Sequence, residues 1–131
     1  MNSADALILI ADDNLDIREM LAARFRAAGY RTVEADDGAA ALEIVAEQHP
    51  NLILMDWVMP TMRGHEVLVQ LKADPDTESV PVVMITGRTS QRDRALGILL
   101  GADAYIFKPI DFDLLDRTVE QLIEAAHSSA A

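Results

Sequence analysis

The fold of this chain is decided by the stretch Leu52-Ile53-Leu54-Met55-Asp56-Trp57-Val58-Met59-Pro60. Four apolar residues run without interruption into Asp56, and Pro60 then ends any regular structure. A short, unbroken apolar run is typical of a strand that is buried on both faces, as in a parallel sheet. Open α/β sheets place their ligand crevice at the carboxyl ends of such strands, so we expect Asp56 to lie in a crevice.

The length and composition predict one ordinary globular domain. The chain has 131 residues, of which 50% are hydrophobic and 25% charged. We expect a single domain over residues 1–131, with a core over 6–126 and short tails at 1–5 and 127–131. Because cysteine is absent, disulfides, thiolate metal sites and cysteine nucleophiles are excluded.

The charge and the hydropathy pattern exclude several classes of partner. A formal net charge of −11 argues against direct binding of nucleic acid. Residues 1–5 show no basic segment followed by an apolar one, and every apolar run is far shorter than a membrane span. We therefore expect no membrane association and a cytoplasmic location. Small groups of arginines suit a protein partner or one small anion, and they are Arg18, Arg24, Arg26, Arg88, Arg92 and Arg94.

Apolar periodicity predicts five strands, each followed by a helix. The expected strands are 7–11, 30–35, 52–55, 80–85 and 104–107. The expected helices follow Asn14 and Gly38, and then cover 65–73, 90–100 and 114–126. This pattern predicts an α/β fold of the (βα)5 type, a doubly wound five-stranded parallel sheet. We take its order to be the flavodoxin-like order 2-1-3-4-5, in which strands 1 and 3 are neighbours.

Polar side chains follow four of the five expected strands. They are Asp12, Asp13, Asp56, Thr86 and Lys108. Two carboxylates roughly 5 Å apart repel by about 3 kcal/mol at an effective dielectric near 20, so three of them need more counter-charge than one lysine supplies. A divalent cation meets that need, and all-oxygen ligation favours Mg²⁺, with Mn²⁺ as an acceptable substitute.

A metal beside a carboxylate at a crevice mouth suggests phosphoryl transfer to that carboxylate. Carboxylates act as covalent nucleophiles and form acyl phosphates. In this hypothesis Asp56 is the nucleophile, while the metal and Lys108 neutralise charge on the transferring group and Thr86 donates a hydrogen bond to it.

Taken together, these motifs resemble the receiver domain of response regulators in two-component signalling, of the chemotaxis-regulator-like, single-domain kind. The matching pieces are Asp-Asp after strand 1, Asp-x-x-x-Pro after strand 3, Thr-Gly after strand 4 and Lys-Pro after strand 5. The resemblance covers residues 6–126. It implies a phosphorylation-activated switch rather than an enzyme. Such a switch accepts a phosphoryl group from a sensor histidine kinase or a histidine phosphotransfer protein, and then dephosphorylates itself.

The resemblance also implies a role for each site residue. Asp56 is the expected phosphoacceptor, and Asp13, Asp56 and the backbone carbonyl of Val58 are the expected Mg²⁺ ligands. Asp12 is expected to act on the metal largely through water. Only residues 127–131 follow the last predicted helix, and we expect a single-domain regulator that acts on a downstream protein target.

Further roles concern phosphoryl binding and the switch. Thr86 and Lys108 are expected to bind the phosphoryl group, and the Lys108–Pro109 peptide is expected to be cis. Tyr105 is the expected switch aromatic, which turns inward when Thr86 moves toward the phosphoryl group. The face formed by the fourth helix, the fifth strand and the fifth helix would then change its shape.

Two positions depart from the commonest pattern of the family. Val58 and Arg88 stand two residues after Asp56 and Thr86, where they flank the path of hydrolytic water. An apolar Val58 cannot orient a water, and Arg88 would either shield the phosphoryl group or attract anionic donors. We expect this pair to lengthen the lifetime of the phosphorylated form.

Two functions of other classes share part of this pattern. A haloacid-dehalogenase-like phosphatase also uses an aspartyl nucleophile and Mg²⁺, but it needs a second aspartate where this chain has Val58. A flavodoxin-like electron carrier needs a phosphate loop rich in Gly, Ser and Thr after strand 1. Here that loop begins with Asp12 and Asp13, which would repel a phosphate in the absence of metal.

Overall fold

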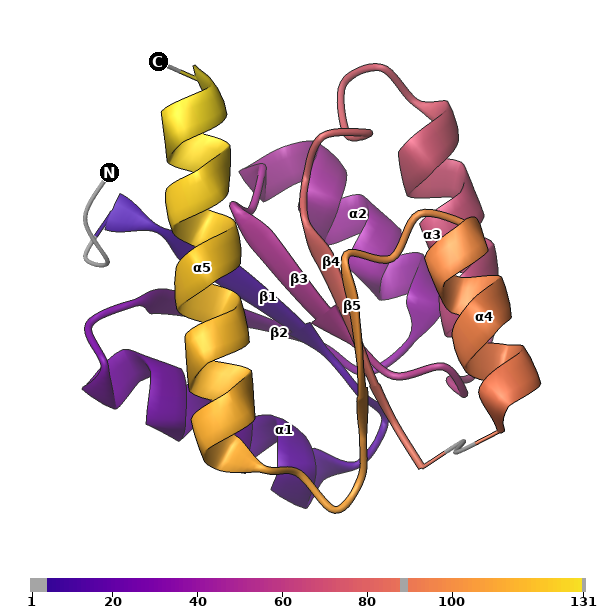
Figure 1. Cartoon of the computed structure of the whole chain (residues 1–131), viewed down its shortest axis with the longest axis horizontal. Helices are drawn as coiled ribbons and strands as arrows, with labels where there is room; N and C mark the ends of the chain where they lie inside the picture. Colours follow the sequence, from indigo (N-terminus) through magenta and orange to yellow (C-terminus); the bar gives the residue numbers. More distant parts are fainter. Residues whose placement is uncertain (1–4, 88–89, 131) are drawn as a thin grey trace.

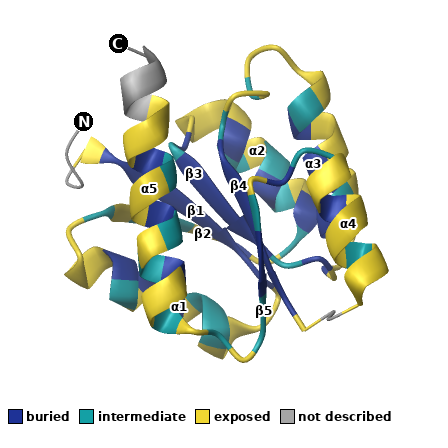
Figure 2. Ribbon diagram, in the orientation of Figure 1, coloured by how far each residue is buried: buried dark blue, intermediate teal, exposed yellow. Residues whose placement is uncertain are grey.

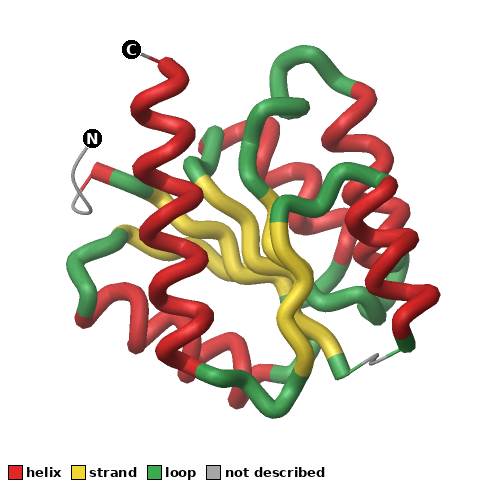
Figure 3. The backbone as a smooth tube through the Cα atoms, viewed as in Figure 1, coloured by secondary structure: helices red, strands yellow, loops and turns green. Residues whose placement is uncertain are grey.

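A computed structural model describes residues 5–87 and 90–130, with side chains up to residue 126. It contains a five-stranded sheet in the order β2-β1-β3-β4-β5. Every neighbouring pair of strands is parallel. Helices cover both faces of this sheet (Figures 1 and 3). The predicted (βα)5 fold and its flavodoxin-like order are therefore confirmed.

Strands and helices alternate along the whole described chain. In order they are β1 (Leu7–Ala11), α1 (Leu15–Ala27), β2 (Arg31–Ala35), α2 (Gly38–Gln48), β3 (Leu52–Met55), α3 (Gly64–Ala73), β4 (Val82–Thr86), α4 (Gln91–Leu99), β5 (Ala104–Phe107) and α5 (Phe112–Ala130). The predicted limits of β1, β3 and β5 are confirmed. β4 begins two residues later than predicted, because Pro81 has no N–H for the ladder and the Val80 N–H donates to the Thr77 carbonyl instead (3.1 Å).

The side chains of the strands contribute to two separate hydrophobic cores, one on each face of the sheet. Figure 2 shows buried strands between helices whose outer surfaces are exposed. Alternate residues of β1 illustrate the division, since Ile8 and Ile10 pack with α1 and α5 while Leu9 and Ala11 pack with α2 and α3. Successive side chains of a strand point to opposite faces, so burial on both faces requires the unbroken apolar runs seen in the sequence. In the part of the chain that the structure describes, no helix has the length and apolar character needed to span a membrane.

Side-chain caps fix where two of the helices begin near the carboxyl ends of the strands. Asn14 accepts a hydrogen bond from the Ile17 N–H (3.1 Å) at the start of α1. Asp37 accepts one from the Ala40 N–H (2.7 Å) at the start of α2. These caps satisfy backbone donors that have no partner inside the helix. The loop between β1 and α1, which carries the acidic pair, is thereby held short and ordered.

Gly64 lets α3 begin directly behind Asp56. Its N–H donates to the Trp57 carbonyl (2.8 Å). A Cβ at this position would overlap the backbone carbonyl of Asp56 and would lie 3.0 Å from the end of the Met84 side chain. The obstructing atom is backbone, so it has no rotamer by which to move away.

We expect the substitution Gly64→Ala to lower the free energy of unfolding by about 1–3 kcal/mol, because the added methyl overpacks the segment that carries Asp56. Gly87→Ala is the matched control, since a Cβ at Gly87 meets no atom within 4 Å. Denaturant unfolding of the two variants measures the difference. Equal stability of both variants would contradict this account of Gly64.

Candidate functional site

Three carboxylates meet at the carboxyl ends of two neighbouring strands. Asp12 and Asp13 follow β1, and Asp56 follows β3, with its N–H donating to the Ala11 carbonyl (3.0 Å). One carboxylate oxygen of each aspartate lies within 4.8 Å of the other two. Asp12 is 4% exposed, so water screens its charge poorly. The crowding predicted from the sequence is therefore present.

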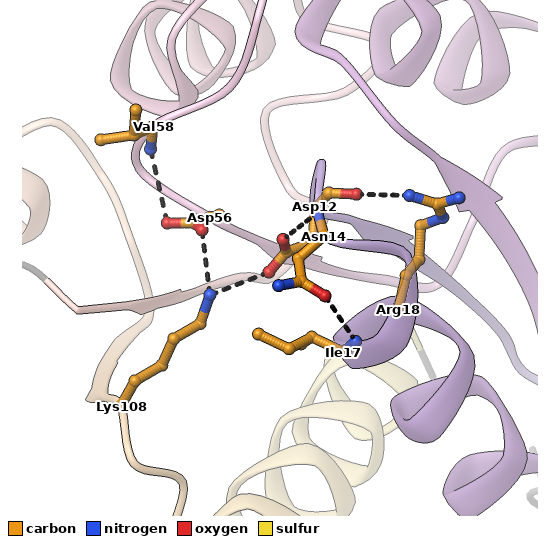
Figure 4. Close-up of polar contacts among 7 residues, drawn as sticks. All are labelled: Asp12, Asn14, Ile17, Arg18, Asp56, Val58 and Lys108. Atoms are coloured by element: carbon orange, nitrogen blue, oxygen red, sulfur yellow. Dashed lines mark hydrogen bonds and ion pairs between the residues drawn. The ribbon is translucent and has the colours of Figure 1, made fainter.

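Lys108 supplies a positive charge to this cluster from the end of β5. Its Nζ lies 3.0 Å from Asp12 Oδ2 and 3.0 Å from Asp56 Oδ2 (Figure 4). The backbone N–H of Lys108 donates to the Thr86 carbonyl (2.8 Å), which ties its position to the end of β4. The Lys108–Pro109 peptide is cis, as the resemblance implies.

Burial and pairing shift the protonation of Asp12 and Lys108. Burial raises the pKa of Asp12 above its ordinary value, and this effect outweighs the hydrogen bonds from the Asn14 N–H and from Lys108 that lower it. Burial lowers the pKa of Lys108, but its hydrogen bonds to Asp56 and Asp12 outweigh that effect, so the pKa of Lys108 lies above its ordinary value. Lys108 is therefore a firmly charged ammonium at neutral pH.

Arg18 holds the backbone of the acidic loop, a role that the sequence did not indicate. Its Nη1 donates to the Asp12 carbonyl (2.8 Å; Figure 4). Its Nε donates to Glu34 Oε1 (3.2 Å). The Asp12 N–H donates in turn to the Ala35 carbonyl (3.1 Å). The only sequence signal is the spacing from Asn14, which puts Arg18 one helical turn after the cap and beside the loop.

The first group of arginines serves internal contacts rather than a partner. Besides the Arg18 contacts, Arg24 makes two hydrogen bonds to the Asp116 carboxylate (3.0 and 2.7 Å). Its guanidinium also lies 4.6 Å from the centre of the Phe112 ring. These contacts join α1 to α5, so the prediction that this group faces a partner or a small anion is wrong for Arg18 and Arg24.

The remaining predicted residues lie at or near the same edge of the sheet. Thr86 is the last residue of β4 and is 1% exposed, and Tyr105 lies in β5 and is 8% exposed. Val58 is 46% exposed, and its N–H donates to Asp56 Oδ1 (3.4 Å). Arg88 lies outside the described residues. The structure thus brings the acidic cluster and Lys108 into direct contact, with Thr86 at the end of the strand between β3 and β5.

The donor set fits a divalent metal ion. Three carboxylates oppose one ammonium, so two negative charges stay uncompensated when all four groups are ionised. The oxygens offered by Asp12, Asp13 and Asp56 are hard ligands, which Mg²⁺ and Mn²⁺ prefer to nitrogen or sulfur. The chain has no cysteine thiolate, and neither His49 nor His65 belongs to the cluster.

Comparison with known proteins identifies the family. The model of the response regulator receiver domain matches residues 8–120. The chain belongs to this family. Receiver domains are phosphoacceptors of two-component systems, and they bind Mg²⁺ at an acidic pocket such as the one described above. The resemblance drawn from the strand-end motifs is therefore confirmed.

Curated relatives are longer proteins that contain a receiver domain. The chain is 40% identical over 121 residues to a probable cyclic di-GMP phosphodiesterase of Vibrio cholerae. This alignment covers 92% of this chain and 27% of that protein. It is 39% identical over 102 residues to the phosphate regulon transcriptional regulatory protein PhoB of Pseudomonas aeruginosa. This alignment covers 78% of this chain and 44% of that protein. The chain thus spans less than half the length of these two relatives.

Solved receiver domains superpose on nearly the whole chain. The receiver domain of Francisella response regulator 1452 has a TM-score of 0.86 at 28% identity, covering 92% of this chain and 98% of that chain. The chemotaxis response regulator CheY4 of Vibrio cholerae has a TM-score of 0.83 at 29% identity, covering 89% and 98%. The receiver fold of this chain is therefore shown both by sequence and by structure.

We expect Lys108→Met to lower the free energy of unfolding at pH 7 by about 1–3 kcal/mol in metal-free buffer, because two partly buried carboxylates lose their cationic donor. Without Lys108 the pKa of Asp12, already raised by burial, rises further, so acid protonates Asp12 and removes the repulsion. The deficit relative to the wild type should therefore shrink as the pH falls from 7 through the raised pKa of Asp12. Denaturant unfolding at several pH values measures it, and a deficit that stays constant with pH would contradict the assignment.

Proposed function

We propose that this receiver domain is a phosphorylation-activated signalling switch in which Asp56 accepts the phosphoryl group. The donor is a sensor histidine kinase or a histidine phosphotransfer protein. The observation that carries the proposal is the contact of the Asp56 carboxylate with Lys108 Nζ (3.0 Å), inside a cluster of three carboxylates. A structural ion pair would not place two further carboxylates against the first, since each adds repulsion.

The chemistry is transfer of one phosphoryl group between two nucleophiles. An O–P bond forms at an Asp56 carboxylate oxygen while the N–P bond of the donor phosphohistidine breaks, and the imidazole leaves with the electron pair. Mg²⁺ bound by Asp13, Asp56 and the Val58 carbonyl, and by Asp12 through water, would neutralise charge on the transferring group. Hydrolysis of the acyl phosphate by water then restores the carboxylate and releases inorganic phosphate, so the domain assists its own dephosphorylation.

Lys108 can pair first with the Asp56 carboxylate and then with the oxygens of a phosphoryl group attached to Asp56. Its ammonium contacts both Asp12 and Asp56, and its raised pKa keeps it protonated while phosphoryl oxygens approach. A phosphoryl group on Asp56 offers new anionic acceptors within reach of the same donor. In this proposal Thr86, buried at the end of β4, binds the phosphoryl group through its hydroxyl.

The switch rests on Thr86 and Tyr105, which lie on adjacent strands. In this proposal Thr86 moves toward the phosphoryl oxygen, Tyr105 turns inward behind it, and the face formed by α4, β5 and α5 changes its affinity for a protein target. The burial of Tyr105 at 8% exposure supports an inward position. A cytoplasmic location and action through a downstream protein, without direct nucleic-acid or membrane binding, belong to the same proposal.

The alternative functions are disfavoured by side chains at the site. A haloacid-dehalogenase-like phosphatase needs a carboxylate two residues after its nucleophile, and the exposed apolar Val58 stands there. An electron carrier that binds flavin phosphate after β1 would meet Asp12 and Asp13 at that place.

We expect the wild type to gain the mass of one phosphoryl group when it is incubated with Mg²⁺ and a small-molecule phosphodonor, and Asp56→Asn to gain none, because an amide is not a nucleophile. Intact mass spectrometry measures the product, and Trp57 fluorescence follows beryllofluoride binding, since Trp57 is the only tryptophan and adjoins the site. Asp76→Asn, at an exposed position between α3 and β4, is the control and should behave as the wild type. An equal response of Asp56→Asn and the wild type would remove Asp56 from its role.

We expect Val58→Asn combined with Arg88→Ala to speed autodephosphorylation about tenfold, because an amide beside Asp56 can orient the attacking water and a valine cannot. Val69→Asn is the control, since Val69 is 45% exposed and Val58 is 46% exposed, but Val69 lies along α3. The decay of the phosphorylated protein measured by mass gives both rates. An unchanged decay in the double variant would show that the pair does not set the lifetime.

A further inference from the structure

Helix α4 attaches to the rest of the described structure through a residue without a side chain. Gly97 is its only buried residue. Leu96, Ile98 and Leu99 are 39%, 47% and 82% exposed. Figure 2 shows α4 with a mostly exposed surface, whereas each of the other four helices buries several side chains in one of the two cores. Gly97 is therefore the point at which α4 comes closest to the core.

That contact is made with two aromatic rings. A Cβ on Gly97 would lie 3.1 and 3.2 Å from two ring carbons of Tyr105 and 3.3 Å from a ring carbon of Trp57. Ordinary contacts between carbon atoms fall near 3.5–4.0 Å. The backbone of α4 thus rests directly on the Tyr105 and Trp57 rings, and a methyl group at residue 97 would fit only if these rings moved by a few tenths of an ångström.

The same rings lead back to the acidic cluster. The Tyr105 ring lies 6.0 Å from the Trp57 ring and 5.4 Å from the Phe107 ring. Trp57 directly follows Asp56, is 3% exposed, and stacks on His65 at 5.0 Å. A continuous line of ring contacts therefore joins the segment of the phosphoacceptor to Gly97.

We propose that Gly97 is a positioning residue for Tyr105, and that the absence of a side chain at this position is what allows the Tyr105 ring to lie inward under α4. Any larger residue competes for the volume that the ring occupies. The Tyr105 side chain can rotate out of that volume, whereas the last turn of α4 is tied to the segment before β5 by the bond from the Ala102 N–H to the Gly97 carbonyl (3.0 Å). Bulk at residue 97 therefore shifts Tyr105 outward.

This inference rests on the proposed function for its consequence. If phosphorylation favours the inward position of Tyr105, a substitution that disfavours that position weakens the binding of a phosphoryl mimic, at most by the factor by which it shifts the Tyr105 equilibrium. Gly97 thus sets how readily the domain enters its active state.

The test compares Gly97→Ala with a variant that keeps the composition of α4. Alanine stabilises a helix relative to glycine, so Ala95→Gly/Gly97→Ala exchanges the two residues and removes that effect, because Ala95 is exposed. The chain has two tyrosines, and Tyr30 packs against the opposite core, so its NMR signals serve as the internal reference. With labelled tyrosine, we expect the Tyr105 ring signals to shift in both variants and the Tyr30 signals to stay in place.

The second measurement is the affinity for beryllofluoride in the presence of Mg²⁺, followed by Trp57 fluorescence. We expect both variants to bind about fivefold more weakly than the wild type, at the lower end of ordinary coupling between sites. Unchanged Tyr105 signals in both variants overturn the proposal, and so does a Tyr105 shift with wild-type affinity. If the wild type itself ignores beryllofluoride, the proposed function fails, while the Tyr105 signals measured without the mimic still decide the role of Gly97.

A double-mutant cycle separates this role from a general loss of packing. In a Tyr105→Ala background the closest ring is gone and only the 3.3 Å contact with Trp57 remains, so the gain in helix propensity should let Gly97→Ala stabilise the protein. In the wild-type background the same substitution should stabilise it less or destabilise it. Thermal unfolding of the four proteins measures the cycle, and an equal effect of Gly97→Ala in both backgrounds contradicts the contact.

Discussion

The mutual repulsion of three carboxylates, restrained by one lysine, is the constraint on which the rest of this molecule depends. Asp12, Asp13 and Asp56 offer oxygens within 4.8 Å of one another, and Lys108 bridges two of them at 3.0 Å. The repulsion in such a cluster lowers the stability of the fold unless a bound cation neutralises it. Phosphoryl chemistry gives the cluster a use that offsets this cost. The surrounding backbone is held by several hydrogen bonds. Strand β1 is anchored between two neighbours, and Arg18 and Asn14 fix the loop that follows it.

The sheet supplies this constraint because its central strands are buried on both faces. Side chains inside β1 and β3 point alternately into the two cores, so polar groups are excluded until the strands end. The first positions that tolerate a carboxylate are therefore the residues just beyond the carboxyl ends, where parallel strands bring them together. The parallel sheet with both faces buried therefore explains both the apolar strands and the gathering of polar groups at their carboxyl ends.

The strand-end residues and the sheet were predictable from the sequence, because apolar runs and turn residues are local signals. The assumed strand order placed Lys108 across the crevice from the three carboxylates, and the structure adds its direct contacts with Asp12 and Asp56. Other features depend on tertiary packing that no local pattern reports. Arg18 was assigned to a partner although it binds the Asp12 carbonyl. The stacking of His65 on Trp57 and the close approach of Gly97 to Tyr105 likewise depend on tertiary packing.

The sparse burial of α4 has a consequence for how the domain opens. Because its one buried residue has no side chain, α4 contributes little apolar area to the core, and its own hydrogen bonds and the Ser90 cap carry most of its order. A segment of this kind separates from the body at a lower free energy than the global unfolding of the sheet. Amide protons of α4 would then exchange with solvent through a local opening, while those of β1 and β3 wait for the whole domain to unfold.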